Sequence, residues 1–259
     1  MRAYAALLRA GYRRQSVYRL ALLSGLATNV FFGIVRTAVF VALYRQRDSM
    51  RGLALADSLT YVWLGQALFG VVWTPWMEEL PERVRSGGFA VELTRPLDPY
   101  TRLLAFDLGR NLSQMLVRSV VPLGAAALLL PMTLPTTAPG VLLLASSMVL
   151  AAVAGFQARF IFVSCAFWTA DWRFLSGMQI AVLWLLCGFV VPTDFFPAPL
   201  RAAADASPLY ALLMAPVDVA VGNGAGRAVA LQALWIAVLA AAGRAVMALA
   251  ERRMVVHGG

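Results

Sequence analysis

The sequence predicts an all-α integral membrane protein with six transmembrane helices, and three observations lead to this fold class. Of the 259 residues, 61% are hydrophobic and 14% are charged. A soluble domain keeps about a quarter of its residues charged to cover its surface. The mean hydropathy is +0.73, and the apolar residues are gathered into long runs. Lipid is therefore the expected solvent for most of the surface.

Six apolar stretches give the expected transmembrane helices, because a bilayer core takes about 20 apolar residues as a helix. They are Leu20–Tyr44, Leu59–Trp76, Leu104–Leu130, Gly140–Phe162, Phe174–Val191 and Ala225–Ala250. Residues 1–259 are expected to form a single transmembrane domain. Small-residue runs in the last stretch, such as Ala240–Gly243, indicate close helix packing.

The distribution of Arg predicts the orientation, because cytoplasmic segments of membrane proteins collect positive charge. With the N-terminus inside, the larger share is cytoplasmic: Arg2, Arg9, Arg13, Arg14, Arg19, Arg83, Arg85, Arg95, Arg102, Arg173, Arg252 and Arg253. The smaller share is outside: Arg45, Arg47, Arg51, Arg201 and Arg227. Both termini are therefore expected in the cytoplasm. This topology accounts for the net charge of +9, so no nucleic-acid partner is expected.

The first segment, residues 1–19, interleaves Tyr and Leu with Arg. This pattern is typical of a helix lying in the headgroup layer, with its apolar side toward the membrane and its Arg residues toward anionic lipid. A disordered basic tail is the alternative.

Two polar segments interrupt the apolar pattern. Residues 78–101 form the longest polar stretch, on the expected cytoplasmic side, and Pro81, Gly87, Gly88, Pro96 and Pro99 break it into short pieces. A structured, charged element of this kind needs a partner to dock against; a solvated loop is the alternative. Residues 192–224, on the outer side, are too apolar for a simple loop and predict one or two short re-entrant helices.

Catalytic and metal sites are not expected. The one His, His257, and the two Cys, Cys165 and Cys187, have no spacing that suits a metal or a nucleophile pair. Asp171, the nearest candidate for interfacial chemistry, stands alone. The chain has no Lys, which excludes a Walker A phosphate loop. The chain therefore cannot bind ATP by that route.

Polar residues inside the predicted spans mark the expected pathway or dimer seam, because such residues must face protein or water. On the third span, spacings of four, three and four put them on one stripe: Asp107, Asn111, Gln114 and Arg118. Arg110 is close enough to pair with Asp107. A helix surface with snorkelling Arg is the alternative. Arg36 and Gln157 are further pathway candidates, although Arg36 can nearly snorkel outward; Arg159 is expected to reach the inner headgroups.

The chain resembles the membrane-spanning subunits of type-2 ABC exporters, in a bacterial subgroup of uncharacterised permeases. The segment Arg85–Pro99, the order of an interfacial helix and six spans, the span-five exit Gly188–Pro197 and the Arg252-Arg253 tail carry the resemblance over the whole length. The resemblance implies an ATP-driven export system, with ATP and Mg on two copies of a separate ATP-binding cassette subunit. It also implies a second permease, related but different, and no catalytic site in this chain.

The resemblance further implies that the segment after span two couples transport to the ATPase. The residues that match are Arg85, Gly87, Gly88, Phe89, Glu92, Leu93, Arg95 and Pro96. The glycines permit a tight turn. Phe89 and Leu93, four apart, are expected to present one apolar face to the ATPase, with Glu92 and Arg95 at the rim. An ATP-independent secondary transporter or channel is the alternative function, although neither internal repeats nor paired intramembrane acids point to it.

Overall fold

The computed structural model describes residues 2–46, 49–50, 52–72, 79–169 and 184–257. These residues form an all-α protein with one short β hairpin, β1 (Ser49–Met50) and β2 (Leu53–Ala54). Among them, five helical stretches are long and apolar enough to cross a membrane: Arg19–Gln46, Leu55–Val72, Pro99–Leu129, Ala138–Phe167 and Ala225–Arg253. Each overlaps one predicted span. The remaining predicted span, Phe174–Val191, lies for the most part outside the described residues.

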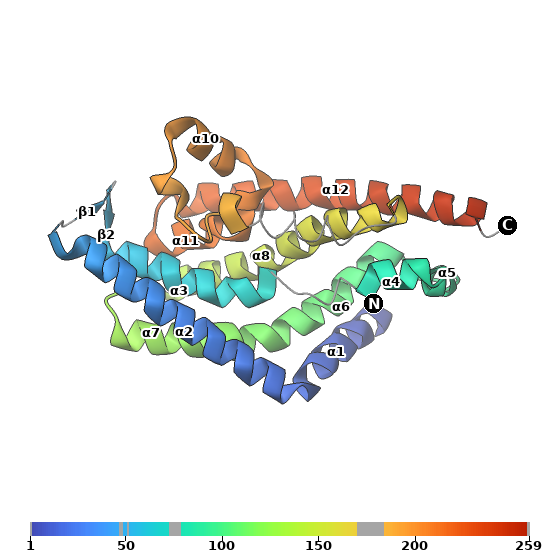
Figure 1. The fold of residues 1–259 in the computed structure, drawn as a ribbon, viewed down its shortest axis with the longest axis horizontal. Coiled ribbons are helices and arrows are strands. Elements are labelled where there is room, and N and C mark those ends of the chain that lie inside the picture. Colours follow the sequence, from blue (N-terminus) through green and yellow to red (C-terminus); the bar gives the residue numbers. More distant parts are fainter. Residues whose placement is uncertain (1, 47–48, 51, 73–78, 170–183, 258–259) are drawn as a thin grey trace.

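The spanning stretches lie side by side along the long axis of the molecule (Figure 1). The N-terminal half contributes α1 (Arg2–Val17), α2 (Arg19–Leu43), η1 (Tyr44–Gln46), α3 (Leu55–Val72), α4 (Glu79–Arg85) and α5 (Gly88–Leu93). A long helix follows in three parts, α6 (Pro99–Gln114), the π-helical η3 (Met115–Val120) and α7 (Val121–Leu129). The remainder comprises α8 (Ala138–Ser164), η4 (Cys165–Phe167), η5 (Thr193–Phe195), α10 (Ala198–Ala206), η6 (Pro208–Leu212), α11 (Met214–Val221) and α12 (Ala225–His257).

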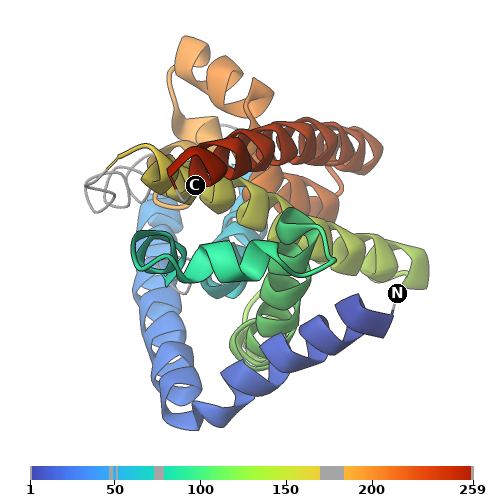
Figure 2. The same cartoon turned by 90° about the vertical axis from the view of Figure 1, so that its right-hand side faces the viewer.

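The two ends of the molecule differ. Both chain termini lie at the end that carries α4 and α5, while the β hairpin and α10 lie at the opposite end (Figures 1 and 2). In the segment predicted to hold one or two short outer helices, the structure has α10 and α11 together with the short turns η5 and η6.

Local signals fix the helix starts. Asp98 caps α6 by accepting a hydrogen bond from the Thr101 backbone N–H at 2.7 Å, and Pro99 follows it in the first turn, where its missing N–H costs nothing. Thr137 caps α8 in the same way through the Gly140 N–H, at 3.3 Å. The long helix therefore begins at Pro99, five residues before the apolar run that predicted it.

The spanning helices differ in how deeply they are packed. In the most apolar 18-residue stretch of α3, 72% of the residues are buried. The side chains of α3 form the centre of the main core with those of α8 and α11. In α2 and α12 the corresponding share is 17%, and large apolar side chains such as Phe31, Phe32 and Leu234 are exposed. A water-soluble protein would not leave such faces open, so these two helices face lipid or another apolar partner.

The first helix packs along α6 rather than standing apart. Gly11 lies against the Phe106 carbonyl, and Gly109 lies against the Leu8 carbonyl, so each glycine receives the backbone of the other helix. The crossing is reinforced by a hydrogen bond from Arg110 Nη2 to Gln15 Oε1, at 2.9 Å. A helix was predicted at residues 1–19 and is present as α1; its placement in the headgroup layer stays a prediction.

Candidate functional site

The segment after α3 folds as two short helices on a second hydrophobic core. Gly87 adopts a left-handed conformation with φ of 75°, which makes the tight turn from α4 into α5. This confirms the predicted turn. Beneath α5, the second core joins residues from α4, α6, α8, η4 and α12: Leu80, Tyr100, Leu103, Phe156, Phe160, Val163, Phe167, Met247 and Ala250. α4 and α5 therefore form a structured unit on this core, called the platform below, rather than a solvated loop.

The prediction that Phe89 faces a partner is wrong. The Phe89 side chain has no exposed surface and packs edge-to-face on Phe167, with ring centroids 5.5 Å apart. Leu93 packs against the same core and is half-buried. The two residues share one face, as their spacing predicts, but that face is turned inward because the aromatic side chains of α8 and η4 bury it.

The Glu92 side chain also forms its contacts inside the chain. Its two carboxylate oxygens accept from Arg83 at 2.7 Å and from Arg102 at 2.6 Å, and Arg102 is 6% exposed. The pairs tie α5 to α4 and α6, so Glu92 holds the platform in place and is not a free rim charge. The outward surface of the segment is formed by other residues: Arg85, Ser86, Gly87, Gly88, Ala90, Val91, Thr94, Arg95 and Pro96. Val91 is 67% exposed.

A buried ion pair lies further along α6. Arg159 Nη2 of α8 donates to Asp107 Oδ2 at 2.9 Å, and their side chains are 2% and 0% exposed. Arg159 Nη1 also donates to the carbonyls of Val71 and Val72, the last residues of α3. The expectation that Arg159 reaches the headgroups is therefore wrong: a carboxylate and two helix-end carbonyls inside the bundle satisfy the guanidinium.

The predicted polar stripe follows the inside of the bundle. Asn111 donates to Asp107 at 2.8 Å, and Gln114 accepts from Arg118 at 2.9 Å. Asp107, Asn111 and Gln114 are buried. Gln157, on α8, is also buried at 2% exposure. The three buried residues of α6 and Gln157 are covered by this chain's own helices, so they do not line a seam between two chains; their assignment to a pathway stays a prediction.

The π-helical turns of η3 are held by side chains from α2 and η3 itself. Pro122 has no N–H for the Arg118 carbonyl, which leaves that carbonyl without its helical donor. Asn29 of α2 donates to this carbonyl at 3.4 Å and to the Gln66 carbonyl at 3.1 Å. Ser119 donates to the Ala67 carbonyl. The irregular turn thus joins α2, α3 and the third span at mid-length, and Arg118 packs its guanidinium against Gly25 and Gly70.

Arg36 turns inward from α2 instead of snorkelling. Its Nη2 donates to the Phe189 carbonyl at 2.6 Å and to the Tyr61 hydroxyl at 3.1 Å. The guanidinium also lies over the rings of Phe189 and Tyr61, 5.0 and 5.3 Å from their centroids, a cation–π arrangement. Within the described parts of the chain, no carboxylate pairs with it.

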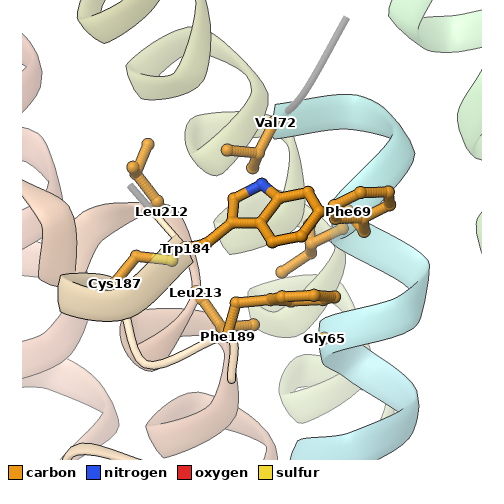
Figure 3. A pocket seen from close by; sticks show the side chains of 9 residues that line it. Gly65, Phe69, Val72, Trp184, Cys187, Phe189, Leu212 and Leu213 are labelled. Atoms are coloured by element: carbon orange, nitrogen blue, oxygen red, sulfur yellow. The ribbon is translucent and has the colours of Figure 1, made fainter. Parts of the chain in front are cut away.

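A mainly apolar groove of about 440 Å³ opens beside Arg36, between α2, α3 and residues 184–190. Its aromatic wall is formed by Phe69, Trp184 and Phe189; the Phe69 and Phe189 rings are stacked at 4.8 Å. Figure 3 shows the same three rings from the adjoining pocket of about 30 Å³, which also contacts Gly65 and Cys187. Cys187 is a buried free thiol in this apolar packing, as the sequence predicted.

The end opposite α4 and α5 carries a polar pocket of about 300 Å³. Arg201 pairs with Asp194 at 2.6 Å and contacts Asp205 at 3.4 Å. Asp218 accepts from the Tyr210 hydroxyl at 2.5 Å and from Asn223 at 3.1 Å. Burial raises the pKa of both Tyr210 and Asp218. Over the described residues, no group of His, Cys, Asp and Glu side chains is arranged to hold a metal ion.

Comparison with protein families gives one match. The family model described as ABC-2 family transporter protein matches residues 31–258. The chain belongs to this family. No curated protein and no solved structure matches the chain.

Membership of the ABC-2 transporter family explains the general features of the molecule. The chain is a multi-pass membrane protein and a type-2 ABC permease, the membrane subunit of a transporter. Members of this family generally associate with an ATP-binding subunit and are not catalytic themselves. The matched region starts within α2, so α1 lies before it.

Several residues that organise this ABC-2 permease were not predicted from the sequence. Asn29, Tyr61 and Gln66 line or brace the Arg36 groove, and Gln232 of α12 is fully buried. Gln232 donates to the carbonyls of Ser147 and Ala211, at 3.0 and 2.9 Å. The signal that could have identified Asn29, Gln66 and Gln232 is a lone amide in an otherwise apolar run, because such an amide needs partners at membrane depth.

Proposed function

We propose that this chain is the membrane-spanning permease of an ATP-driven export system, and that a separate ATP-binding subunit docks on the outward surface of α5. The observation that carries the proposal is the exposure of Val91, 67%, on a helix whose other side is anchored by the buried Phe89. An apolar side chain held outward on a fixed platform, with Arg85 and Arg95 exposed on either side, suits a partner's cleft.

Contacts inside the chain supply a route from this surface to the spans. Force on α5 reaches α6 through the Glu92–Arg102 pair and reaches η4 through the packing of Phe89 on Phe167. Further along, the Asp107–Arg159 pair joins α6 to α8, and Arg159 holds the end of α3. Movement of the ATPase would therefore shift α3, α6 and α8 together, because each link is buried or ion-paired and cannot slip independently.

The proposed orientation places both termini and α4–α5 in the cytoplasm, with the chain in the inner membrane of a bacterium. It is supported by the shared end of the termini and these helices (Figure 2) and by the Arg distribution. ATP and Mg would be bound by two copies of the ATP-binding subunit. The open faces of α2 and α12 leave room for a second permease, which we propose is a related but different chain.

The deciding experiment is purification of tagged chain from its native host in mild detergent, followed by identification of every co-purifying protein. We expect an ATP-binding subunit to be recovered with the wild type and lost with Val91→Asp. Leu200→Asp is the matched control, since Leu200 is an exposed apolar residue, 41% exposed, on α10 at the other end. It should retain the ATPase.

Two results would count against the proposal. Equal recovery of the ATP-binding subunit with Val91→Asp and with wild type would show that this subunit does not dock on α5. A wild-type chain that purifies without any ATPase at every detergent strength would favour the ATP-independent carrier instead.

A further inference from the structure

Arg36 is a cation held inside the membrane region without an acidic partner. It lies eight residues before Tyr44 on α2, which places it roughly 12 Å along the helix from the end beside the β hairpin. A charged side chain at membrane depth is costly, and such residues generally face a protein interior or a cavity and mark a functional path. For Arg36 the described residues supply a carbonyl, a hydroxyl and two ring faces, all of them neutral.

The Arg36 guanidinium can donate hydrogen bonds to one more acceptor. Its Nη1 atom is shielded from solvent and has no hydrogen-bond acceptor among the described residues. Gly65 lies beside this nitrogen: a Cβ atom added to Gly65 would lie 3.7 Å from Nη1, so a larger side chain there would take up the space next to the guanidinium. The positive charge is thus positioned by Tyr61 and Phe189 but is not neutralised by them.

The groove next to Arg36 is shaped for an apolar chain. Its volume is about 440 Å³, and the lining is dominated by Phe32, Phe69, Trp184 and Phe189. Phe32 is 51% exposed on the open apolar side of α2, next to Phe31 at 61%. The groove therefore has exposed apolar side chains at its edge and a cation in its lining, which is complementary to a molecule with a hydrophobic tail and an acidic group.

We propose that this groove receives an anionic amphiphile as transport cargo, with its acidic group on Arg36 and its tail along Phe32 and Phe69. This inference rests on the proposed permease function and names the class of its cargo. Position along the helix favours cargo over a resident lipid: lipid headgroups lie at the bilayer surface, whereas an acid that meets Arg36 lies between the spans, roughly 12 Å along α2 from Tyr44. A cationic cargo would be repelled by Arg36, and a neutral one could accept a hydrogen bond from it but would gain no charge attraction.

The test uses the purified chain in a non-ionic detergent and two matched probes, dibromostearate and its methyl ester. Both quench tryptophan fluorescence through bromine and differ by one negative charge when the carboxyl is ionised. The Trp184 signal is isolated as the difference between wild type and Trp184→Phe. We expect saturable quenching of Trp184 with the carboxylate binding about tenfold more tightly than the ester, a difference typical of one added charge-assisted contact.

Variants assign the preference to Arg36. Arg36→Gln should make the two probes equivalent, while Arg45→Gln, at an exposed Arg of η1 outside the groove, should keep the preference. Equal affinity of the two probes for the wild type would overturn the proposal without any need for a folded variant. A preference that persists in Arg36→Gln would also overturn it.

A second measurement separates this inference from the proposed function. Binding is measured on the permease alone, so Val91→Asp should leave the quenching unchanged even though it loses the ATPase. In the complex with the ATPase, dibromostearate should stimulate ATP hydrolysis and the ester should not. Charge-dependent binding without stimulation would assign the groove to a resident lipid and overturn the cargo assignment.

Discussion

Arg159 and Asp107 form an ion pair at 2.9 Å between α8 and α6, and both side chains are almost fully buried. The pair does more than neutralise two charges. Asp107 also accepts from Asn111, and Arg159 also donates to the Val71 and Val72 carbonyls at the end of α3. Three spanning helices therefore meet at one polar contact, at the end of α3.

Replacing Arg159 by Gln is expected to destabilise the protein strongly. Removing one partner of a buried pair leaves an uncompensated charge and typically costs about 3–5 kcal/mol. The melting temperature of the detergent-solubilised chain should fall clearly. Glu79→Gln is the control, because the Arg14–Glu79 pair is 45% and 42% exposed and exposed pairs contribute about 0–1 kcal/mol. Similar melting temperatures for the two variants would show that the interior pair does not hold the helices.

The reciprocal glycine contact between α1 and α6 gives a second prediction. Gly11→Ala places a methyl group against the Phe106 carbonyl, which is backbone and cannot rotate away. We expect a loss of about 1–3 kcal/mol, as for overpacked sites. Gly124→Ala, in α7 with no atom within 4 Å of the added carbon, should be neutral or slightly stabilising. Thermal unfolding of both variants checks the prediction, and an unaffected Gly11→Ala protein would exclude close packing of α1 on α6.

Hydropathy was sufficient to locate the described spanning helices, because lipid requires long apolar runs and backbone hydrogen bonds that close within each helix. The tight turn at Gly87 also followed from local sequence. Contacts between helices did not, because no periodicity relates Asp107 to Arg159, fifty-two positions away. The π-helical turns were missed as well, although Pro122 within an apolar run was a signal of irregular backbone.

Phe89 shows where the sequence argument failed. Its spacing from Leu93 correctly indicates a shared helical face, but spacing does not specify what covers that face. In the structure the cover is Phe167 and the rest of the second core, so the outward side belongs to Val91. The Arg36 groove was only partly predictable: Arg36 was a pathway candidate, whereas the inward turn depends on Tyr61 and Phe189 from distant parts of the chain.

Phe89→Ala should lower the stability of the folded protein, whereas Val91→Asp should weaken binding of the ATP-binding subunit. A fully buried aromatic ring replaced by a methyl group typically costs about 3–5 kcal/mol through lost contacts and the remaining cavity. Phe89→Leu should cost less because it retains most of the volume. The measurement is the melting temperature together with ATPase recovery. A Phe89→Ala protein that melts like wild type but fails to recover the ATPase would restore the original prediction that Phe89 contacts the partner.

The Tyr210–Asp218 contact predicts a pH dependence at the opposite end of the molecule. Burial raises the pKa of the Asp218 carboxyl above its ordinary value of 3.8, with Asp194 and Asp205 adding to the rise and the hydrogen bonds from Tyr210 and Asn223 opposing it. The folded protein therefore holds this proton more tightly than the unfolded chain does. The carboxyl's contribution to stability is then most favourable below 3.8 and declines as pH rises through the raised pKa.

Asp218→Asn removes the ionisation but keeps a side chain of the same size. The loss of hydrogen bonds to Tyr210 or Asn223 shifts stability by an amount that does not depend on pH, so the informative quantity is the melting temperature of the variant minus that of wild type. This difference should become more positive between acidic and neutral pH. Asp98→Asn, at the exposed cap of α6, controls for loss of one negative charge. A difference that stays flat, or falls, with rising pH would show that the Asp218 carboxylate is no less stable in the folded protein than in the unfolded chain.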